Sequence, residues 1–219
     1  MKTAILFGAT GLVGNQLLKL LIENNDYHKI KIFSRKEILT KNPKLQKYVI
    51  DFNELEKFKD EIFGDDCFFA IGTTRKLTPN KNDYINIELN LPVKISKIAK
   101  NNNVKSFIYV SSGGANANSI NLYLQNKGKA ENEIINLSFE FTAIIRPSLL
   151  LGNRKENRIG EKIAKFIFKN LSFIFIGKLR VFKPIQAKNV AKSIMYIKNN
   201  QVNDLFFTSD KLENFSLIK

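Results

Sequence analysis

Short apolar runs alternate with stretches of helical periodicity through the first two thirds of the chain. The runs have the length of buried strands and cover residues 3–7, 30–33, 47–50, 67–71, 107–110 and 141–145. Between them, apolar residues recur at helical spacing over residues 12–21, 54–63, 87–100 and 123–137. This alternation predicts parallel strands joined by right-handed crossovers. We therefore predict an α/β fold with a doubly wound parallel sheet of the Rossmann type, which binds ligands at the carboxyl ends of its strands.

The last third of the chain has a less regular pattern. Four apolar residues follow helical spacing with basic residues between them, which predicts a basic amphipathic helix: Ile159, Ile163, Phe166 and Ile167. An apolar run over residues 171–176 follows. We expect a helix and a strand that cap the sheet, with a lid over substrate, a dimer contact or a membrane-surface patch as alternatives. The length of 219 residues suits a single domain over residues 1–219, in which about residues 150–219 form a small substrate or lid portion.

The composition limits the class of partner and the compartment. The formal net charge is +15, but the lysines are spread along the chain without an arginine-rich tract, so no specific nucleic-acid binding is expected. The single cysteine, Cys67, lies in an apolar run, which suits a buried thiol in a reducing compartment. The N-terminus enters a predicted strand at once, and no segment approaches the roughly 20 apolar residues of a membrane span. These features predict a cytoplasmic protein without a transmembrane segment.

A glycine-containing loop follows the first predicted strand and opens the first predicted helix. Glycines let the backbone approach a pyrophosphate closely, and the amides and dipole at a helix N-terminus favour negative charge. The spacing Gly-x-x-Gly-x-x-Gly departs from the Gly-x-Gly-x-x-Gly pattern, yet its place between strand and helix predicts a dinucleotide site. An ordinary strand-to-helix turn is the alternative. The predicted cofactor-binding residues of this loop are Gly8, Thr10, Gly11, Leu12, Val13 and Gly14.

The end of the second predicted strand indicates which dinucleotide is preferred. An acidic residue is expected about 20 residues after the loop when the ligand is NAD, because it accepts a hydrogen bond from the ribose 2′-hydroxyl. Ser34, Arg35 and Lys36 stand there instead. A guanidinium binds a 2′-phosphate with two parallel hydrogen bonds, and a lysine adds a point charge. NADP(H) is therefore favoured and NAD(H) remains possible, with a solvated basic loop as the alternative interpretation.

A candidate proton-transfer site lies after the fifth predicted strand. Tyr123 and Lys127 share one face of a predicted helix, and Ser111 and Ser112 stand at the carboxyl end of the strand before it. Free tyrosine has a pKa of about 10, and an ammonium within ~4 Å contributes up to about 4 kcal/mol at an effective dielectric of 20, which lowers that pKa by two or three units. Such a tyrosine can exchange a proton with an alcohol or carbonyl while a serine holds the substrate oxygen. A surface tyrosine and lysine are the alternative.

Other reaction classes lack the residues that they need. The chain has one histidine, His28, placed near the end of the first predicted helix. A serine-histidine-acid triad or a multi-histidine metal site cannot be assembled from it, so hydrolase and zinc chemistry are disfavoured and no metal site is expected.

Taken together, these segments resemble atypical short members of the short-chain dehydrogenase/reductase superfamily related to the Tat-interacting-protein oxidoreductases. The resemblance runs over most of the chain. It rests on the segments at residues 8–14, 34–36, 70–75, 110–115, 122–128 and 145–150.

The resemblance implies roles for individual residues. Tyr123 and Lys127 would be the catalytic pair, Lys127 would also hold the nicotinamide ribose, and Ser111 or Ser112 would lie beside the substrate. Further positions would approach the cofactor: Asp51, Phe52, Ile71, Gly72, Thr73, Thr74, Pro147 and Ser148. The chain lacks the long carboxyl-terminal substrate domain of sugar-nucleotide epimerases, which argues against a large nucleotide-sugar substrate.

Two functions are compatible with this sequence. The first is an NADP(H)-dependent oxidoreductase that acts on a small carbonyl or alcohol. The second is a non-catalytic NADP(H)-binding sensor that acts through partner contacts, and the apolar stretch at residues 171–176 motivates it. A monomer or a homodimer suits either function.

Overall fold

The computed structural model describes residues 1–152 and 181–218 of the chain. Seven strands form one sheet in the order β3-β2-β1-β4-β5-β6-β9, and every neighbouring pair is parallel. The strands are β1 (Lys2–Phe7), β2 (Tyr27–Ser34), β3 (Leu45–Val49), β4 (Asp66–Phe69), β5 (Ser106–Val110), β6 (Phe141–Arg146) and β9 (Phe206–Thr208). The order reverses direction at β1, which confirms the predicted doubly wound Rossmann sheet.

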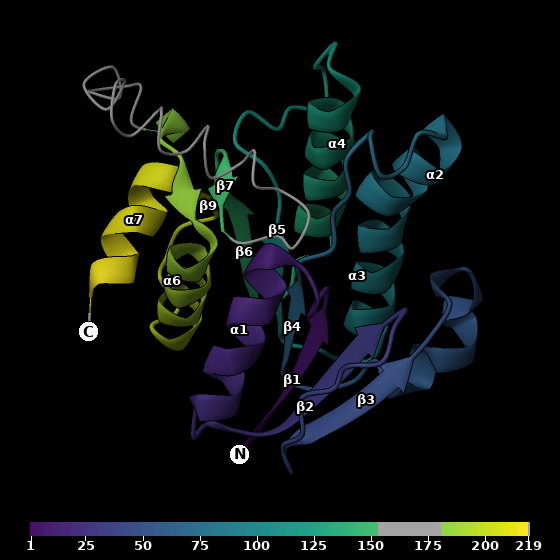
Figure 1. The fold of residues 1–219 in the computed structure, drawn as a ribbon, viewed down its shortest axis with the longest axis vertical. Coiled ribbons are helices and arrows are strands. Elements are labelled where there is room, and N and C mark those ends of the chain that lie inside the picture. The colour runs from purple at the N-terminus through teal and green to yellow at the C-terminus, as the bar shows by residue number, and fades with distance from the viewer. Residues whose placement is uncertain (153–180, 219) are drawn as a thin grey trace.

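Helices cover both faces of the sheet (Figure 1). On one face lie α1 (Leu12–Glu23), α6 (Ala187–Asn199) and α7 (Ser209–Leu217). On the other lie α3 (Leu91–Asn101) and α4 (Leu122–Asn136). Among these described helices none is long and apolar enough to cross a membrane.

The core consists of two apolar layers that the alternation along each strand separates. On β1, Ala4 and Leu6 face the layer that contains α1 and α6, whereas Ile5 and Phe7 face the layer that contains α3 and α4. Because side chains of a strand point alternately to opposite faces, a strand buried on both faces is a continuous apolar run. Cys67 is buried in the second layer, where burial raises the pKa of its thiol well above the ordinary value.

Two predicted helices differ from those in the structure. Residues 54–63 were expected to be an α-helix, but the segment is a 3₁₀ helix, η1 (Phe52–Glu61), with a kink at Glu54. Residues 87–100 were expected to form one helix. The helical segment begins earlier instead, as α2 (Lys81–Ile85), and passes through a π-helical turn, η2 (Asn86–Asn90), into α3. His28 was placed near the end of the first helix, but it lies on β2.

The C-terminal part adds elements that the periodicity did not predict. A short parallel pair, β7 (Leu150–Leu151) and β8 (Ile185–Gln186), is followed by α6, β9 and α7. Strand β9 pairs with β6 and so extends the sheet at the edge. The predicted basic amphipathic helix and the apolar run at 171–176 lie outside the described residues.

A buried polar cluster joins α6 to the amino end of the sheet. Asp66 accepts a 2.7 Å hydrogen bond from the Tyr27 hydroxyl and forms a 3.1 Å ion pair with Lys198. All three residues are buried, so each polar group has a partner in place of water. This cluster lies at the end of the strands opposite to the predicted ligand site.

Candidate functional site

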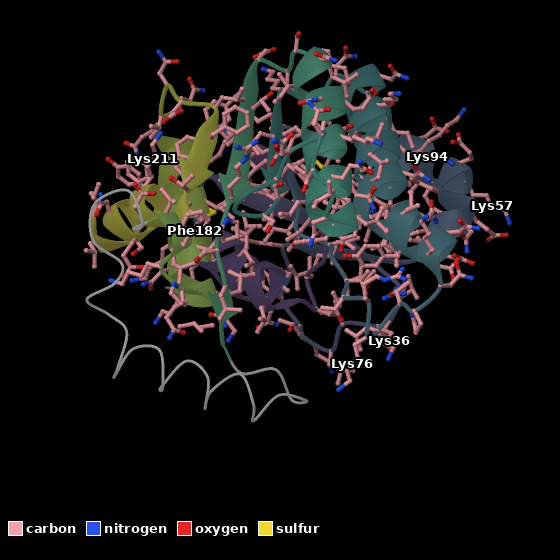
Figure 2. The ribbon with its side chains drawn as sticks, turned by 90° about the horizontal axis from the view of Figure 1, so that it is seen from above. Lys36, Lys57, Lys76, Lys94, Phe182 and Lys211 are labelled. Atoms are coloured by element: carbon pink, nitrogen blue, oxygen red, sulfur yellow. The ribbon has the colours of Figure 1, made fainter. Side chains whose placement is uncertain are left out.

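A cleft follows the carboxyl ends of β1, β4, β5 and β6 and consists of two adjoining cavities. The larger has a volume of about 660 Å³ and the smaller about 330 Å³. Both are lined by Gly11, Ala70, Ile71 and Gly72, so they meet between the glycine loop and the end of β4. Figure 2 shows Phe182 of the larger cavity and Lys36 of the smaller one well apart, at the two ends of the cleft.

The glycine loop lies where the two cavities meet, and two of its glycines, Gly8 and Gly14, are sterically required. Gly8 has φ +92°, and a Cβ on Gly14 would lie 2.1 Å from the Gly8 carbonyl oxygen. Gly14 is therefore buried beneath the loop and allows α1 to pack directly against it, while Gly8, Thr10, Gly11, Leu12 and Val13 line the cleft. Helix α1 begins without a side-chain cap or an acidic residue in its first turn. Its N-terminus thus presents amides and a favourable dipole to an anion.

The smaller cavity contains the predicted selector of the 2′ group. Arg35 and Lys36 are exposed and line it together with Phe52. Ser34 also lines it, and its hydroxyl donates a 2.6 Å hydrogen bond to the Lys36 carbonyl, which fixes the turn after β2. Asp51 does not line either cavity; it is exposed and caps η1 by accepting a 2.9 Å hydrogen bond from the Asn53 amide.

The larger cavity brings together the residues of the predicted reaction site. Tyr123 and Lys127 of α4 line it with Ser111 and Ser112, which follow β5. Thr73, Thr74 and Ser148 also line it, whereas Pro147 does not. Ser148 is anchored because its amide donates a 2.8 Å hydrogen bond to the Ser209 hydroxyl at the start of α7. Apolar side chains contribute the remaining walls: Leu12, Leu149, Leu150 and Phe182.

Lys127 is buried and surrounded by acceptors. Its Nζ lies 3.0 Å from Glu88 Oε2, donates a 3.2 Å hydrogen bond to the Tyr109 hydroxyl and a 3.3 Å one to the Val110 carbonyl. Burial lowers the pKa of Lys127, but attraction to Tyr109, Glu88 and Tyr123 outweighs burial and holds that pKa above its usual value. Lys127 is therefore a fixed cation at the base of the cleft.

The two adjacent serines have different surroundings. Ser111 is buried and its hydroxyl donates a 2.5 Å hydrogen bond to Glu131 Oε1. Glu131 in turn accepts two hydrogen bonds from Arg146, from Nε at 3.0 Å and from Nη2 at 2.5 Å. Ser112 is half-buried, and the only hydrogen bond of its hydroxyl to the described residues is a 3.4 Å contact with the Gly113 carbonyl. The Ser111 hydroxyl thus already donates its hydrogen bond to Glu131, whereas the Ser112 hydroxyl can donate a hydrogen bond to a ligand.

The structure adds site residues that the sequence did not reveal. Glu88, Tyr109, Glu131 and Arg146 hold the groups that line the cleft, although none of the four lines it directly. Arg146 was noted only within the segment at 145–150. A buried acid at helical spacing resembles a solvated one in the sequence, so only the fold identifies these partners.

Two proteins are similar in sequence to this chain over most of its length. It is 34% identical over 225 residues to "Protein FMP52, mitochondrial" of Meyerozyma guilliermondii, an alignment that covers 91% of this chain and 93% of the relative. It is 30% identical over 174 residues to "Protein HTATIP2" of Rattus norvegicus, which covers 78% and 72% of the two chains.

These relatives contradict the predicted cytoplasmic location. FMP52 proteins of several yeasts, including Candida albicans at 33% identity over 93% of this chain, are named as mitochondrial. A buried thiol indicates only a reducing compartment, and it does not distinguish the cytoplasm from the interior of a mitochondrion. The location was therefore inferred wrongly from features that both compartments share.

Solved structures show the fold, and a family comparison shows the family. The UDP-N-acetylglucosamine 4-epimerase of Methanobrevibacter ruminantium superposes with a TM-score of 0.69 at 16% identity, over 94% of this chain and 75% of that one. A short-chain dehydrogenase/reductase superfamily protein of Agrobacterium tumefaciens with bound NAD gives 0.67 at 12% identity, over 89% and 73%. The sequence model of the family described as NAD(P)H-binding matches residues 8–169. The chain therefore belongs to the NAD(P)H-binding family, as an atypical member with the fold of short-chain dehydrogenases and epimerases.

Proposed function

We propose that this protein is an NADP(H)-dependent oxidoreductase that acts on a small carbonyl or alcohol. One observation carries the proposal: a single cleft has the glycine loop at its middle, Arg35 at one end, and Tyr123, Lys127 and Ser112 at the other. A dinucleotide is an elongated molecule whose diphosphate separates two nucleosides, so its parts match the order of these groups along the cleft.

The residues that would hold the cofactor follow from that order. The amides at the start of α1 would bind the diphosphate, and Arg35 and Lys36 would bind the 2′-phosphate. Thr73 and Ser148 would lie beside the nicotinamide end, with Lys127 toward its ribose. When bound, the nicotinamide would supply or accept hydride.

Two side chains would manage the substrate oxygen. The Tyr123 hydroxyl would give a proton to that oxygen during reduction and take it back during oxidation. The Ser112 hydroxyl would donate a hydrogen bond to the same oxygen, because the Ser111 proton is held by Glu131. The apolar walls at Leu12, Leu149 and Phe182 suit a small substrate with an apolar body.

Stopped-flow measurement of hydride transfer from NADPH to a panel of small carbonyls tests the proposal. We expect turnover by the wild type that falls by at least about a hundredfold in Tyr123→Phe, the scale of general acid catalysis. Tyr196→Phe is the matched control, because Tyr196 lies on α6, remote from the cleft, and stacks on Phe215. Equal rates in Tyr123→Phe and the wild type would refute the catalytic assignment.

One observation favours a nucleotide-binding sensor as the second candidate. The Lys127 ammonium already has three protein groups around it, at 3.0, 3.2 and 3.3 Å, so it is well satisfied before any ligand arrives. A sensor would show partner binding that changes with NADPH. Pull-downs from a mitochondrial extract of the source cell, with and without NADPH, test this candidate, and a partner set indifferent to nucleotide counts against it.

A further inference from the structure

Glu88 is a fully buried carboxylate beneath the cofactor cleft. It lies on the π-helical turn η2, between α2 and α3. Oε1 accepts a 2.5 Å hydrogen bond from the Thr73 amide, and Oε2 lies 3.0 Å from the Lys127 ammonium without a hydrogen bond of its own among the described groups. One side chain therefore contacts both the loop after β4 and the lysine of α4.

The place of Glu88 relates it to the ligand rather than to the core alone. A Cβ on Gly72 would lie 3.5 Å from Glu88 Oε1, so the carboxylate is directly beneath the loop that lines both cavities. A π-helical turn costs stability and tends to occur at functional sites. In this protein the turn η2 contains Glu88, whose carboxylate faces Lys127 in the interior. An unpaired charge would be strongly disfavoured there.

We propose that Glu88 is a positioning residue that joins the Thr73 loop to Lys127 and keeps this lysine charged and aimed at the cofactor cleft. The inference rests on the proposed function, because it assumes that Lys127 contacts bound NADP(H). Glu88 itself does not line the cleft and so acts through Lys127 and Thr73.

The physical reason is the balance of charge around Lys127. Titratable groups face it from several elements: Glu88 of η2, Tyr109 of β5, Tyr123 of α4 and Tyr84 of α2, with Glu131 near Tyr109 and Arg75 near Tyr84. Burial opposes the charged form of Lys127, and Glu88 is one of the groups that offset it. Without that carboxylate, less attraction offsets burial, so the pKa of Lys127 falls and the lysine loses its proton at a lower pH.

Calorimetric titration of NADPH across about pH 7.5 to about pH 10 tests the inference, since the 2′-phosphate is ionised throughout that range. The wild type should bind with a constant dissociation constant. In Glu88→Gln, which keeps shape but removes charge, affinity should fall by about tenfold or more toward the alkaline end, the worth of a charged hydrogen bond. Glu133→Gln is the control, because it breaks the half-exposed ion pair with Lys97 on the outer face of α4. It should behave as the wild type.

Further variants keep the outcome decisive. Lys127→Met in the Glu88→Gln background should abolish the dependence on pH, because no lysine remains to titrate. Glu88→Asp keeps the charge and should bind more weakly but with a constant affinity, and it serves if Glu88→Gln does not fold. A Glu88→Gln protein whose affinity stays constant and equal to the wild type overturns the inference, as does a pH-dependent Glu88→Asp. A wild type that binds no NADPH overturns the proposed function instead.

Discussion

At the scale of single residues, the proposed preference for NADP(H) depends on one exposed cation, Arg35. Arg35 is exposed in the smaller cavity, and within the described part of the chain its side chain takes part in no ion pair or hydrogen bond. By contrast, Lys127 and Arg146 are already paired with acidic side chains. Removing the Arg35 guanidinium, which has no partner among the described residues, should therefore change stability little and weaken binding of a 2′-phosphate strongly.

Arg35→Ala should weaken NADPH binding by about 10- to 100-fold, because a hydrogen bond to a charged group contributes about 1.5–3 kcal/mol. Binding of NADH, which lacks the 2′-phosphate, should change little. Fluorescence titration of both nucleotides measures the effect, with Lys41→Ala, another exposed cation between β2 and β3, as the control. Equal affinity of the wild type for NADPH and NADH would remove the argument for a selector.

The two serines after β5 should separate stability from chemistry. Ser111→Ala deletes the donor to Glu131 and leaves a buried carboxylate oxygen with one partner fewer, so unfolding in urea should show a loss of about 1–3 kcal/mol. Ser112→Ala should change stability by less than about 0.5 kcal/mol.

Single-turnover hydride transfer should give the opposite order, with the larger rate loss in Ser112→Ala. A Ser111→Ala protein that keeps wild-type stability but loses all hydride transfer would reverse the assignment of the two hydroxyls.

At the scale of elements, the first six strands of the sheet were predictable from the sequence, whereas β9 and several helices were not. A strand buried on both faces, such as β1, is a nearly continuous apolar run. The ends of that run therefore predict where the strand begins and ends. Segment η1 has four acidic residues in its ten and one buried residue, Leu55, so its weak periodicity suited either type of helix. The turn η2 contains Glu88, whose ion pair with Lys127 no local pattern encodes.

The junction of β1 and α1 should tolerate no side chain at Gly14. In Gly14→Ala the new Cβ meets the Gly8 carbonyl at 2.1 Å, so the helix and the loop must separate. We expect a loss of about 1–3 kcal/mol in stability, the usual cost of overpacking, together with a large loss of NADPH affinity.

Asn15→Ala, one residue along on the exposed side of α1, is the control for this substitution. It should be neutral or slightly stabilising, because alanine favours helix. Urea unfolding and calorimetry of both variants check the expectation, and a Gly14→Ala protein that binds NADPH as the wild type does would contradict the tight junction.

At the scale of the whole molecule, the sequence indicated which residues line the cleft better than which residues support them. Position relative to the predicted strands and helices marked several residues as ligand-binding candidates: the glycine loop, Arg35 and the Tyr123–Lys127 pair. In the structure they lie in one cleft. Glu131 and Glu88 support that cleft from long range, 20 residues from Ser111 and 15 from Thr73. The net charge of +15 predicted no site: Lys36, Lys57, Lys94 and Lys211 lie spread around the molecule (Figure 2).

The tyrosines should make the fold sensitive to strong alkali. Four of the six have a raised pKa in the folded protein: Tyr27, Tyr48, Tyr84 and Tyr109. Burial is the largest cause for each, and Asp66 and Glu61 add to it at Tyr27 and Tyr48. At Tyr109 the charge of Lys127 opposes burial, and the pKa still rises to about 12. The folded state therefore favours the neutral phenols more than the unfolded chain does.

The sign of the effect follows from that difference. Below the unfolded pKa of about 10 the contribution to stability is complete, and it is lost as the pH rises through the folded values, which are about 12 for Tyr84 and Tyr109. Titration of tyrosinate absorbance, followed in parallel with far-ultraviolet circular dichroism, should show these four phenols ionising together with loss of the helices. Tyr27→Phe removes one such group and its bond to Asp66, so it should lower stability at neutral pH yet flatten its decline in alkali. Ionisation of all six tyrosines near pH 10 with the dichroism unchanged would mean that these hydroxyls are not held neutral by the fold.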